Sequence, residues 1–215
     1  MSGIRSLFIV LGACILVSCE KPYHPNEKAF MELKALAAAG NVEAQYKLGE
    51  TYYKGIDVGR NDVEAIKWFT AASQKNHPKA QNKLGLMYRG GIAVEKNYRE
   101  AIQWFKKAAN QGLPEAQYNL AIMYDGTHGR ANHEEMIALL ISSANQGYAS
   151  AQFALGSLYA IDDADLVEAY KWADLACDTN ERGATELRTE LEKKMTRVQI
   201  SEGKKRAALL RSEQN

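Results

Sequence analysis

The sequence has almost no net charge, few cysteines and no enzyme signature, and each shortage excludes a class of protein. With 27 basic and 26 acidic residues the net charge is +1, so there is no surplus of Lys and Arg to favour nucleic acid binding. The chain also lacks a serine nucleophile elbow, a Gly-Lys phosphate loop and a dinucleotide fingerprint. At 46% hydrophobic and 25% charged residues it has the composition of an ordinary globular protein. We therefore expect a folded chain that is not an enzyme and needs no cofactor.

The first 26 residues are expected to form a targeting signal followed by a tether. Arg5 precedes an apolar run over residues 7–17, which is shorter than the roughly 20 residues that span a bilayer. The run ends in Leu16-Val17-Ser18-Cys19, which resembles the bacterial lipobox. The resemblance implies that residues 1–18 are a cleaved signal peptide, that Cys19 is lipidated, for example with palmitate, and that residues 19–26 are a tether. Because Glu20 is not Asp, the resemblance favours anchoring in the outer membrane, facing the periplasm; the alternative is an ordinary signal followed by a chance Cys.

The remaining cysteine content excludes disulfides. Cys14 lies in the expected signal and Cys19 would carry lipid, so only Cys177 is left. A lone Cys beside Ala176 on a helix is more often a small core residue than a nucleophile.

One pattern occurs four times and dominates the rest of the chain. It is opened by an Ala, with a Leu four residues later and a Tyr eight residues later; the opening residues are Ala44, Ala80, Ala116 and Ala151. The spacings of 36, 36 and 35 residues are typical of a stacked repeat array. We divide the span 41–180 into repeats 41–76, 77–112, 113–147 and 148–180.

Each repeat is predicted to be a first helix, a turn and a second helix. Glycine in the middle of a first helix costs about 1 kcal/mol relative to Ala, so we expect the second helix to approach closely at Gly49, Gly85 and Gly156. The second helices are expected to bury an Ala, Trp, Ala stripe that contains Trp68, Trp104 and Trp172. Positive φ is expected at the turn glycines Gly55, Gly59, Gly90, Gly91, Gly126 and Gly129. The third repeat departs from the stripe with Met136, Leu139 and Ser143.

The ends of the array are expected to be capped. Residues 27–40 read as the second helix of a degenerate half repeat, and residues 181–215 as capping helices that hide the last apolar face. Thr196 is a candidate N-cap for the final helix, and residues 211–215 are expected to fray.

The repeat pattern resembles the SEL-one-like repeat family, which is related to the tetratricopeptide repeats. The residues that carry the resemblance are Ala-Gln-x-x-Leu-Gly-x-x-Tyr, a Gly turn, and then Ala-x-x-Trp-(Phe/Tyr)-x-x-Ala-Ala-x-x-Gly. The resemblance implies an all-α, right-handed α-solenoid of helix-turn-helix repeats of about 36 residues that scaffolds other proteins. The chain lacks the disulfide in every repeat that one subgroup of the family carries.

Two polar clusters contain side chains that can bind metal ions. His128 and His133 lie near Asp125 and Glu134, but without ligand spacing such as His-x-x-x-His on one helix. The acidic cluster around Asp165 lacks the Gly and terminal Glu of a calcium loop and is better suited to capping a helix. We predict no metal.

The side of the first helices that faces away from the second helices is predicted to form a concave partner-binding groove. Its candidate residues are Glu43, Tyr46, Glu50, Tyr53, Asn82, Leu86, Arg89, Tyr118, Ile122, Asp125, Phe153 and Ser157. Aromatic and aliphatic residues with a few charges suit an extended protein or peptide partner. Two alternatives stay open: the rings fill gaps between repeats, or the groove binds peptidoglycan or another glycan polymer, as in an export-machine component.

Overall fold

The chain is an array of paired antiparallel helices. The structure, a computed structural model, describes residues 25–214 apart from 57, 126–129, 164 and 180. The predicted signal peptide and nearly all of the predicted tether, including Cys19, lie outside the described residues. The helices in chain order are α1 Pro25–Ala38, α2 Val42–Lys54, α3 Asp62–Gln74, α4 Pro78–Gly90, α5 Tyr98–Ala109, α6 Pro114–Asp125, α7 Arg130–Asn145, α8 Ala149–Ala160, the 3-10 helix η1 Ile161–Asp163, α9 Leu166–Cys177, α10 Ala184–Lys194 and α11 Arg197–Gln214.

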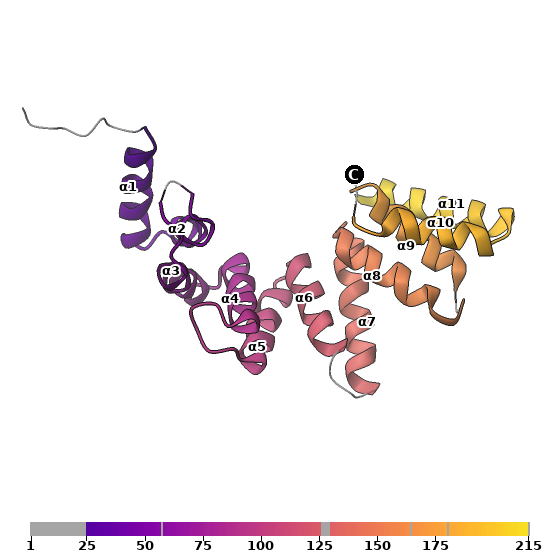
Figure 1. Cartoon of the computed structure of the whole chain (residues 1–215), viewed down its shortest axis with the longest axis horizontal. Coiled ribbons are helices and arrows are strands. Elements are labelled where there is room, and N and C mark those ends of the chain that lie inside the picture. The colour runs from indigo at the N-terminus through magenta and orange to yellow at the C-terminus, as the bar shows by residue number, and fades with distance from the viewer. Residues whose placement is uncertain (1–24, 57, 126–129, 164, 180, 215) are drawn as a thin grey trace, which may run out of the picture.

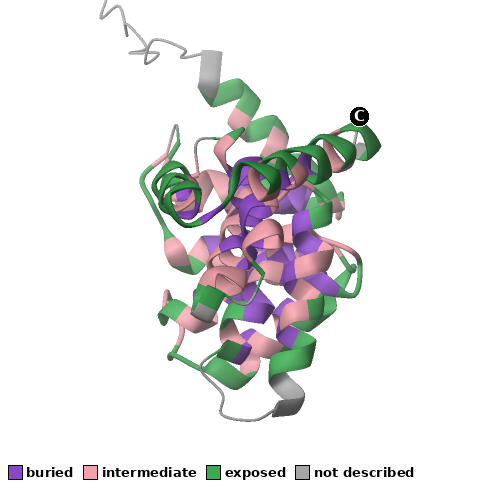
Figure 2. Cartoon of the chain, turned by 90° about the vertical axis from the view of Figure 1, so that its right-hand side faces the viewer, coloured by how far each residue is buried: buried purple, intermediate pink, exposed green. Residues whose placement is uncertain are grey.

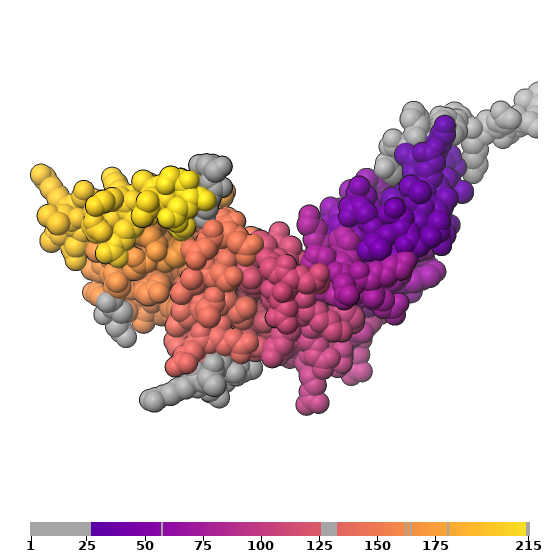
Figure 3. Space-filling view, turned by 180° about the vertical axis from the view of Figure 1, so that it is seen from behind, coloured from indigo at the N-terminus to yellow at the C-terminus, as the bar shows by residue number. Residues whose placement is uncertain are grey.

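The pairs follow one another in a curved stack. In Figure 1 the stack bends into an arc, with α1 at one end and α10 and α11 at the other. The space-filling view in Figure 3 shows a broad depression between the two raised ends. The all-α repeat solenoid predicted from the sequence is therefore confirmed. Among the described residues, no helix is long and apolar enough to cross a membrane.

Small residues let the two helices of a repeat touch. A Cβ added to Gly49 would lie 2.7 Å from the Phe69 ring, and one added to Gly85 would lie 2.5 Å from the Phe105 ring. Any side chain at these positions would force the helices apart, which confirms the predicted close approach.

The residues that fill the space between the helices differ from the prediction. Phe69 and Phe105 are fully buried, whereas Trp68 and Trp104 on the preceding positions are partly exposed. The predicted Trp stripe is therefore wrong for the first two repeats, because the ring one position later points at the mid-helix glycine. In the fourth repeat Trp172 is buried, and the position that holds Phe in the first two repeats holds Ala173, which approaches Gly156.

The seams between repeats are joined by amide side chains. The Gln that follows the opening Ala of a repeat donates from Nε2 to a carbonyl near the end of the preceding helix: Gln45 to Ala37, Gln81 to Ser73 and Gln152 to Ala144. These bonds satisfy carbonyls that a helix end leaves without a partner. Figure 2 shows the buried residues gathered along the centre of the stack and the exposed residues along its flanks.

Turn chemistry follows the prediction only in part. Gly55 and Gly91 have φ of 70° and 69° and end α2 and α4, where a side chain would be strained. Gly59 and Gly90 do not have positive φ, so that prediction was wrong for them. Gly126 and Gly129 lie outside the described residues. Asp165 caps α9, accepting from the Glu168 amide at 3.0 Å, as predicted.

The C-terminal helices cover the end of the stack. Thr196 Oγ1 accepts from the Gln199 amide at 3.3 Å, and Gln199 Oε1 accepts from the Thr196 amide at 2.9 Å, which confirms the predicted cap. Arg211 is held by Asp174 at 3.0 Å and Asp178 at 2.6 Å, and α11 continues to Gln214. The expectation that the chain frays from residue 211 was wrong, because these two carboxylates fix the last turns to α9.

Candidate partner-binding surface

The predicted groove residues fall into a buried and an accessible group. We call the side of α2, α4, α6 and α8 that carries them the first-helix surface. Tyr46 and Asn82 are buried, with 8% of each residue exposed. The accessible or half-buried members are Glu43, Glu50, Tyr53, Leu86, Arg89, Tyr118, Ile122, Asp125, Phe153 and Ser157.

The two buried members belong to seams between repeats. The Tyr46 ring stacks on the His77 ring at 4.6 Å between centroids and lies 5.9 Å from the Phe69 ring. Asn82 Oδ1 accepts from Asn119 Nδ2 at 3.0 Å, which joins α4 to α6. For these two residues the structure shows gap filling and cross-linking of repeats rather than an open surface.

Aromatic and acidic side chains meet near the amino ends of the first helices. The rings of Tyr118 on α6 and Tyr148 before α8 are 5.4 Å apart. Burial, and then the neighbouring Tyr148 and the charge of Glu181, raise the pKa of Tyr118. Burial also raises the pKa of Tyr148, and the charges of Glu115 and Glu181 add to the shift. Both phenols therefore stay neutral and present ring surface rather than charge.

A hollow of about 200 Å³ lies between α6 and α8, with α7 as its floor. Its walls come from the second half of α6, the middle of α7 and the carboxyl end of α8. The lining residues are Ile122, Asp125, Met136, Leu140, Ala154, Ser157, Leu158 and Ile161. Ile122, Asp125 and Ser157 were predicted as groove residues, and the structure brings these three together in one place.

The other lining residues were missed by sequence reasoning. Met136 and Leu140 lie on the second helix of the third repeat, and Met136 stands where the other repeats have an Ala. Ile161 follows α8 directly, where the first two repeats have a glycine turn, and 58% of it is exposed. The departures of the third repeat and the shortened fourth turn were visible in the sequence, but only the fold shows that they meet.

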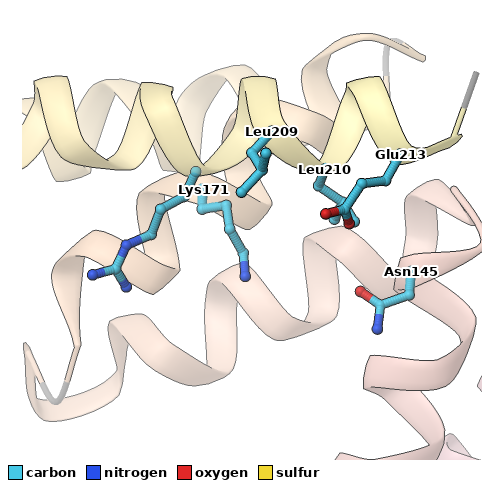
Figure 4. A pocket seen from close by; sticks show the side chains of 6 residues that line it. Asn145, Lys171, Leu209, Leu210 and Glu213 are labelled. Atoms are coloured by element: carbon cyan, nitrogen blue, oxygen red, sulfur yellow. The ribbon is translucent and has the colours of Figure 1, made fainter.

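A second hollow, of about 230 Å³, lies between α7, α9 and α11. Figure 4 shows Lys171 and Asn145 below Leu209, Leu210 and Glu213 of α11. Lys171 and Arg206 both pair with Glu168, at 2.5 Å and 2.8 Å. Both cations are thus already paired with Glu168: the Lys171 pair lies within α9, and the Arg206 pair joins α11 to α9.

Within the described residues, no group of three His, Cys, Asp or Glu side chains could hold a metal ion. His133 and Glu134 are exposed on α7, and His128 lies outside the described residues. Cys177 is a half-buried free thiol whose Sγ lies 3.8 Å from the Thr185 hydroxyl oxygen. These side chains do not form a catalytic arrangement among the described residues.

Comparisons with known proteins agree with the repeat geometry. The family model described as Sel1 repeat matches residues 42–77, 78–113, 114–148 and 149–179, which is more than half of the chain. Residues of the chain are similar to c5321, a protective antigen of uropathogenic Escherichia coli with an SLR fold, at 30% identity and a TM-score of 0.78 over 86% of this chain and 40% of that one. A Sel1 repeat protein from Oxalobacter formigenes is also 30% identical, with a TM-score of 0.67 over 75% of this chain and 66% of that one.

A curated relative matches a much shorter segment. A putative sel1-like repeat-containing protein, L18, of Acanthamoeba polyphaga mimivirus is 42% identical over 45 residues, 21% of this chain. The chain spans 8% of that relative and 40% of c5321, so both are considerably longer proteins.

Proposed function

The chain belongs to the Sel1 repeat family, whose members are generally non-enzymatic and mediate contacts between proteins, and from this premise we propose that it is a scaffold that holds a segment of a partner protein on its first-helix surface. A repeat stack presents one long surface built from equivalent positions, which suits an extended ligand. The observation that carries the proposal is the hollow between α6 and α8, because it combines an apolar lining with accessible residues of the first-helix surface.

We also propose that the scaffold works at the bacterial cell envelope, anchored by lipid on Cys19 and facing the periplasm, in the outer membrane. The support is the sequence Leu16-Val17-Ser18-Cys19 after a short apolar run, followed by Glu20. In this arrangement residues 19–26 would place the first repeat close to the membrane surface.

The proposed function can be tested by photo-crosslinking in intact cells. Replacing Ile122 with p-benzoylphenylalanine puts the reactive group at the edge of the hollow, and replacing Val63 on α3 puts it on an exposed site elsewhere, since Val63 is 66% exposed. We expect a discrete protein adduct from the Ile122 position and none from Val63.

Two results would contradict the proposal. Equal adducts from both positions would mean that contact is non-specific. Adducts of the Ile122 position with glycan instead of protein would favour the alternative, a component that binds peptidoglycan or another glycan polymer.

A further inference from the structure

We infer that the hollow between α6 and α8 takes one aliphatic side chain of a partner segment, and that Asp125 receives a Lys or Arg side chain next to it. The inference rests on the proposed function and specifies the chemistry of the partner at this site. It follows from the size of the hollow, from its lining and from the charge around it.

The size of the hollow limits what can enter. Its volume of about 200 Å³ is below the roughly 300–1,000 Å³ of sites that hold drug-sized molecules or cofactors. A single large side chain fits a hollow of this size. A buried side chain of this kind commonly anchors a protein interface.

The lining selects an aliphatic group. Six of the eight lining residues are apolar, and all six are aliphatic or Met: Ile122, Met136, Leu140, Ala154, Leu158 and Ile161. The hollow contains no basic side chain, and its polar members are Asp125 and Ser157 at the edge. Met136 can adjust its shape to the group that enters, because its side chain is unbranched and flexible.

The two helices on either side of the hollow carry charge of one sign. The helix α6 contains Glu115 and Asp125 and no basic residue, and α8 contains no charged residue at all. This differs from α4, which carries Lys79, Lys83 and Arg89 and no acidic residue. A partner segment that lies across α6 and α8 is therefore complementary if it is basic.

Asp125 is available for such a partner. It is exposed at the last position of α6, and its side chain forms no hydrogen bond or ion pair with any residue that the structure describes. Arg89 holds the matching position on α4, and no ion pair joins it to Asp125 within the described part of the chain. A carboxylate beside the carbonyl end of a helix is also unfavourably placed, so a cation from a partner would stabilise this site.

A selection from a random peptide library on the immobilised full chain tests the inference. We expect the enriched peptides to share a Leu, Ile, Val or Met within about two positions of a Lys or Arg, because both groups must reach one small site. Enrichment of acidic peptides, of peptides without an aliphatic residue, or of none at all would overturn it.

Variants then locate the binding site of an enriched peptide. Ile161→Lys places a charge in the hollow, and Asp125→Lys reverses the charge at its edge; each should weaken binding by about tenfold or more. The matched controls are Val63→Lys, an exposed aliphatic on α3, and Glu186→Lys, an exposed carboxylate on α10, and each should change binding by less than about twofold. All four sites are exposed, so the fold should tolerate the changes.

The outcomes separate this inference from the proposed function. If binding is lost with Leu86→Ala combined with Tyr118→Ala but not with the two hollow variants, the scaffold proposal stands and the role of the hollow is rejected. If in-cell crosslinking captures no protein at Ile122, the proposed function fails independently of the peptide selection.

Discussion

At the scale of single residues, the Gln that follows the opening Ala differs between repeats in its hydrogen bonds. Within the part of the chain that the structure describes, its side-chain oxygen accepts a hydrogen bond in the second and third repeats but not in the first. In the second repeat Gln81 Oε1 accepts from Gln111 Nε2 at 2.7 Å, and in the third Gln117 Oε1 accepts from Gln146 Nε2 at 2.9 Å. The first repeat has Lys75 at the equivalent position, and its Nζ donates to the Gly40 carbonyl at 2.6 Å instead. Gln45 Oε1 is left buried without a hydrogen-bond partner among the described residues.

Replacing Lys75 with Gln should therefore stabilise the protein. The new amide can donate to Gln45 Oε1 as Gln111 does to Gln81, and a buried acceptor without a partner costs about 1–3 kcal/mol. The exposed bond from Lys75 to Gly40 is lost, so we expect a net gain of about 0.5–1.5 kcal/mol in the free energy of unfolding, measured by chemical denaturation.

Lys75→Ala is the control for this prediction. It removes the bond to Gly40 without supplying a donor, so it should be neutral or slightly destabilising. If Lys75→Gln and Lys75→Ala have the same effect, the missing partner of Gln45 does not limit stability.

At the scale of helices, α9 carries a pH-dependent pair of ion pairs at Glu168, and one of them, with Arg206, holds α11 to α9. Glu168 accepts from Lys171 at 2.5 Å and from Arg206 at 2.8 Å. Burial opposes ionisation of the carboxyl, but the hydrogen bonds from Lys171 and Arg206 outweigh it and lower the pKa of Glu168 below its ordinary value of 4.5. A carboxyl whose pKa is lower in the folded state stabilises the fold above its unfolded pKa, and this contribution disappears as pH falls through the lowered pKa.

Glu168→Gln should accordingly destabilise the protein at pH 7 and have little effect in strong acid. Both bridges are partly exposed to water, so we expect about 0.5–1 kcal/mol at pH 7, shrinking as the pH falls below about 4.5. Denaturation curves of the two proteins across this pH range measure the difference.

Glu190→Gln removes an exposed pair with Lys193 and is the control, which should change stability little at any pH. A Glu168→Gln effect that is as large in strong acid as at pH 7 would show that the carboxylate acts through packing alone.

The elements that the sequence predicted well are those whose signals lie within one helix. The opening Ala, the Leu and the mid-helix Gly repeat at fixed spacing, so the pairing of α4 with α5 could be read from Ala80, Leu84 and Gly85. The sequence did not predict whether Trp104 or Phe105 is the buried ring. Both lie on the side toward the core, and a shift of one position decides which ring reaches Gly85.

The candidate site was predicted to a smaller extent. Ile122 and Asp125 share one face of α6, which helical spacing predicts. Their approach to Ile161 depends on the angle between two repeats and on η1, which replaces a glycine turn. Contacts of this kind depend on the curvature of the whole stack. The sequence pattern of a single repeat does not predict that curvature.

At the scale of the whole molecule, the question is where the solenoid is held. Its first described helix begins at Pro25, six residues after Cys19, so a lipid on Cys19 would keep the first repeat next to a membrane and let the rest of the arc extend from it. Several acyl chains on one residue hold a protein stably, because each buried methylene contributes about 0.8 kcal/mol.

Cys19→Ser should release the protein from the membrane without changing its fold. The proposed lipid would be attached through the thiol of Cys19, and the apolar run over residues 7–17 is too short to span a bilayer, for which roughly 20 residues are required. We expect the wild-type chain in the detergent-extracted membrane fraction with a mass raised by its acyl groups, and the variant in the soluble fraction with the same helical circular dichroism. Intact residues 1–18 on the exported wild-type protein would show that the signal is not cleaved before Cys19. A variant that stays in the membrane would show that another part of the chain provides the anchor.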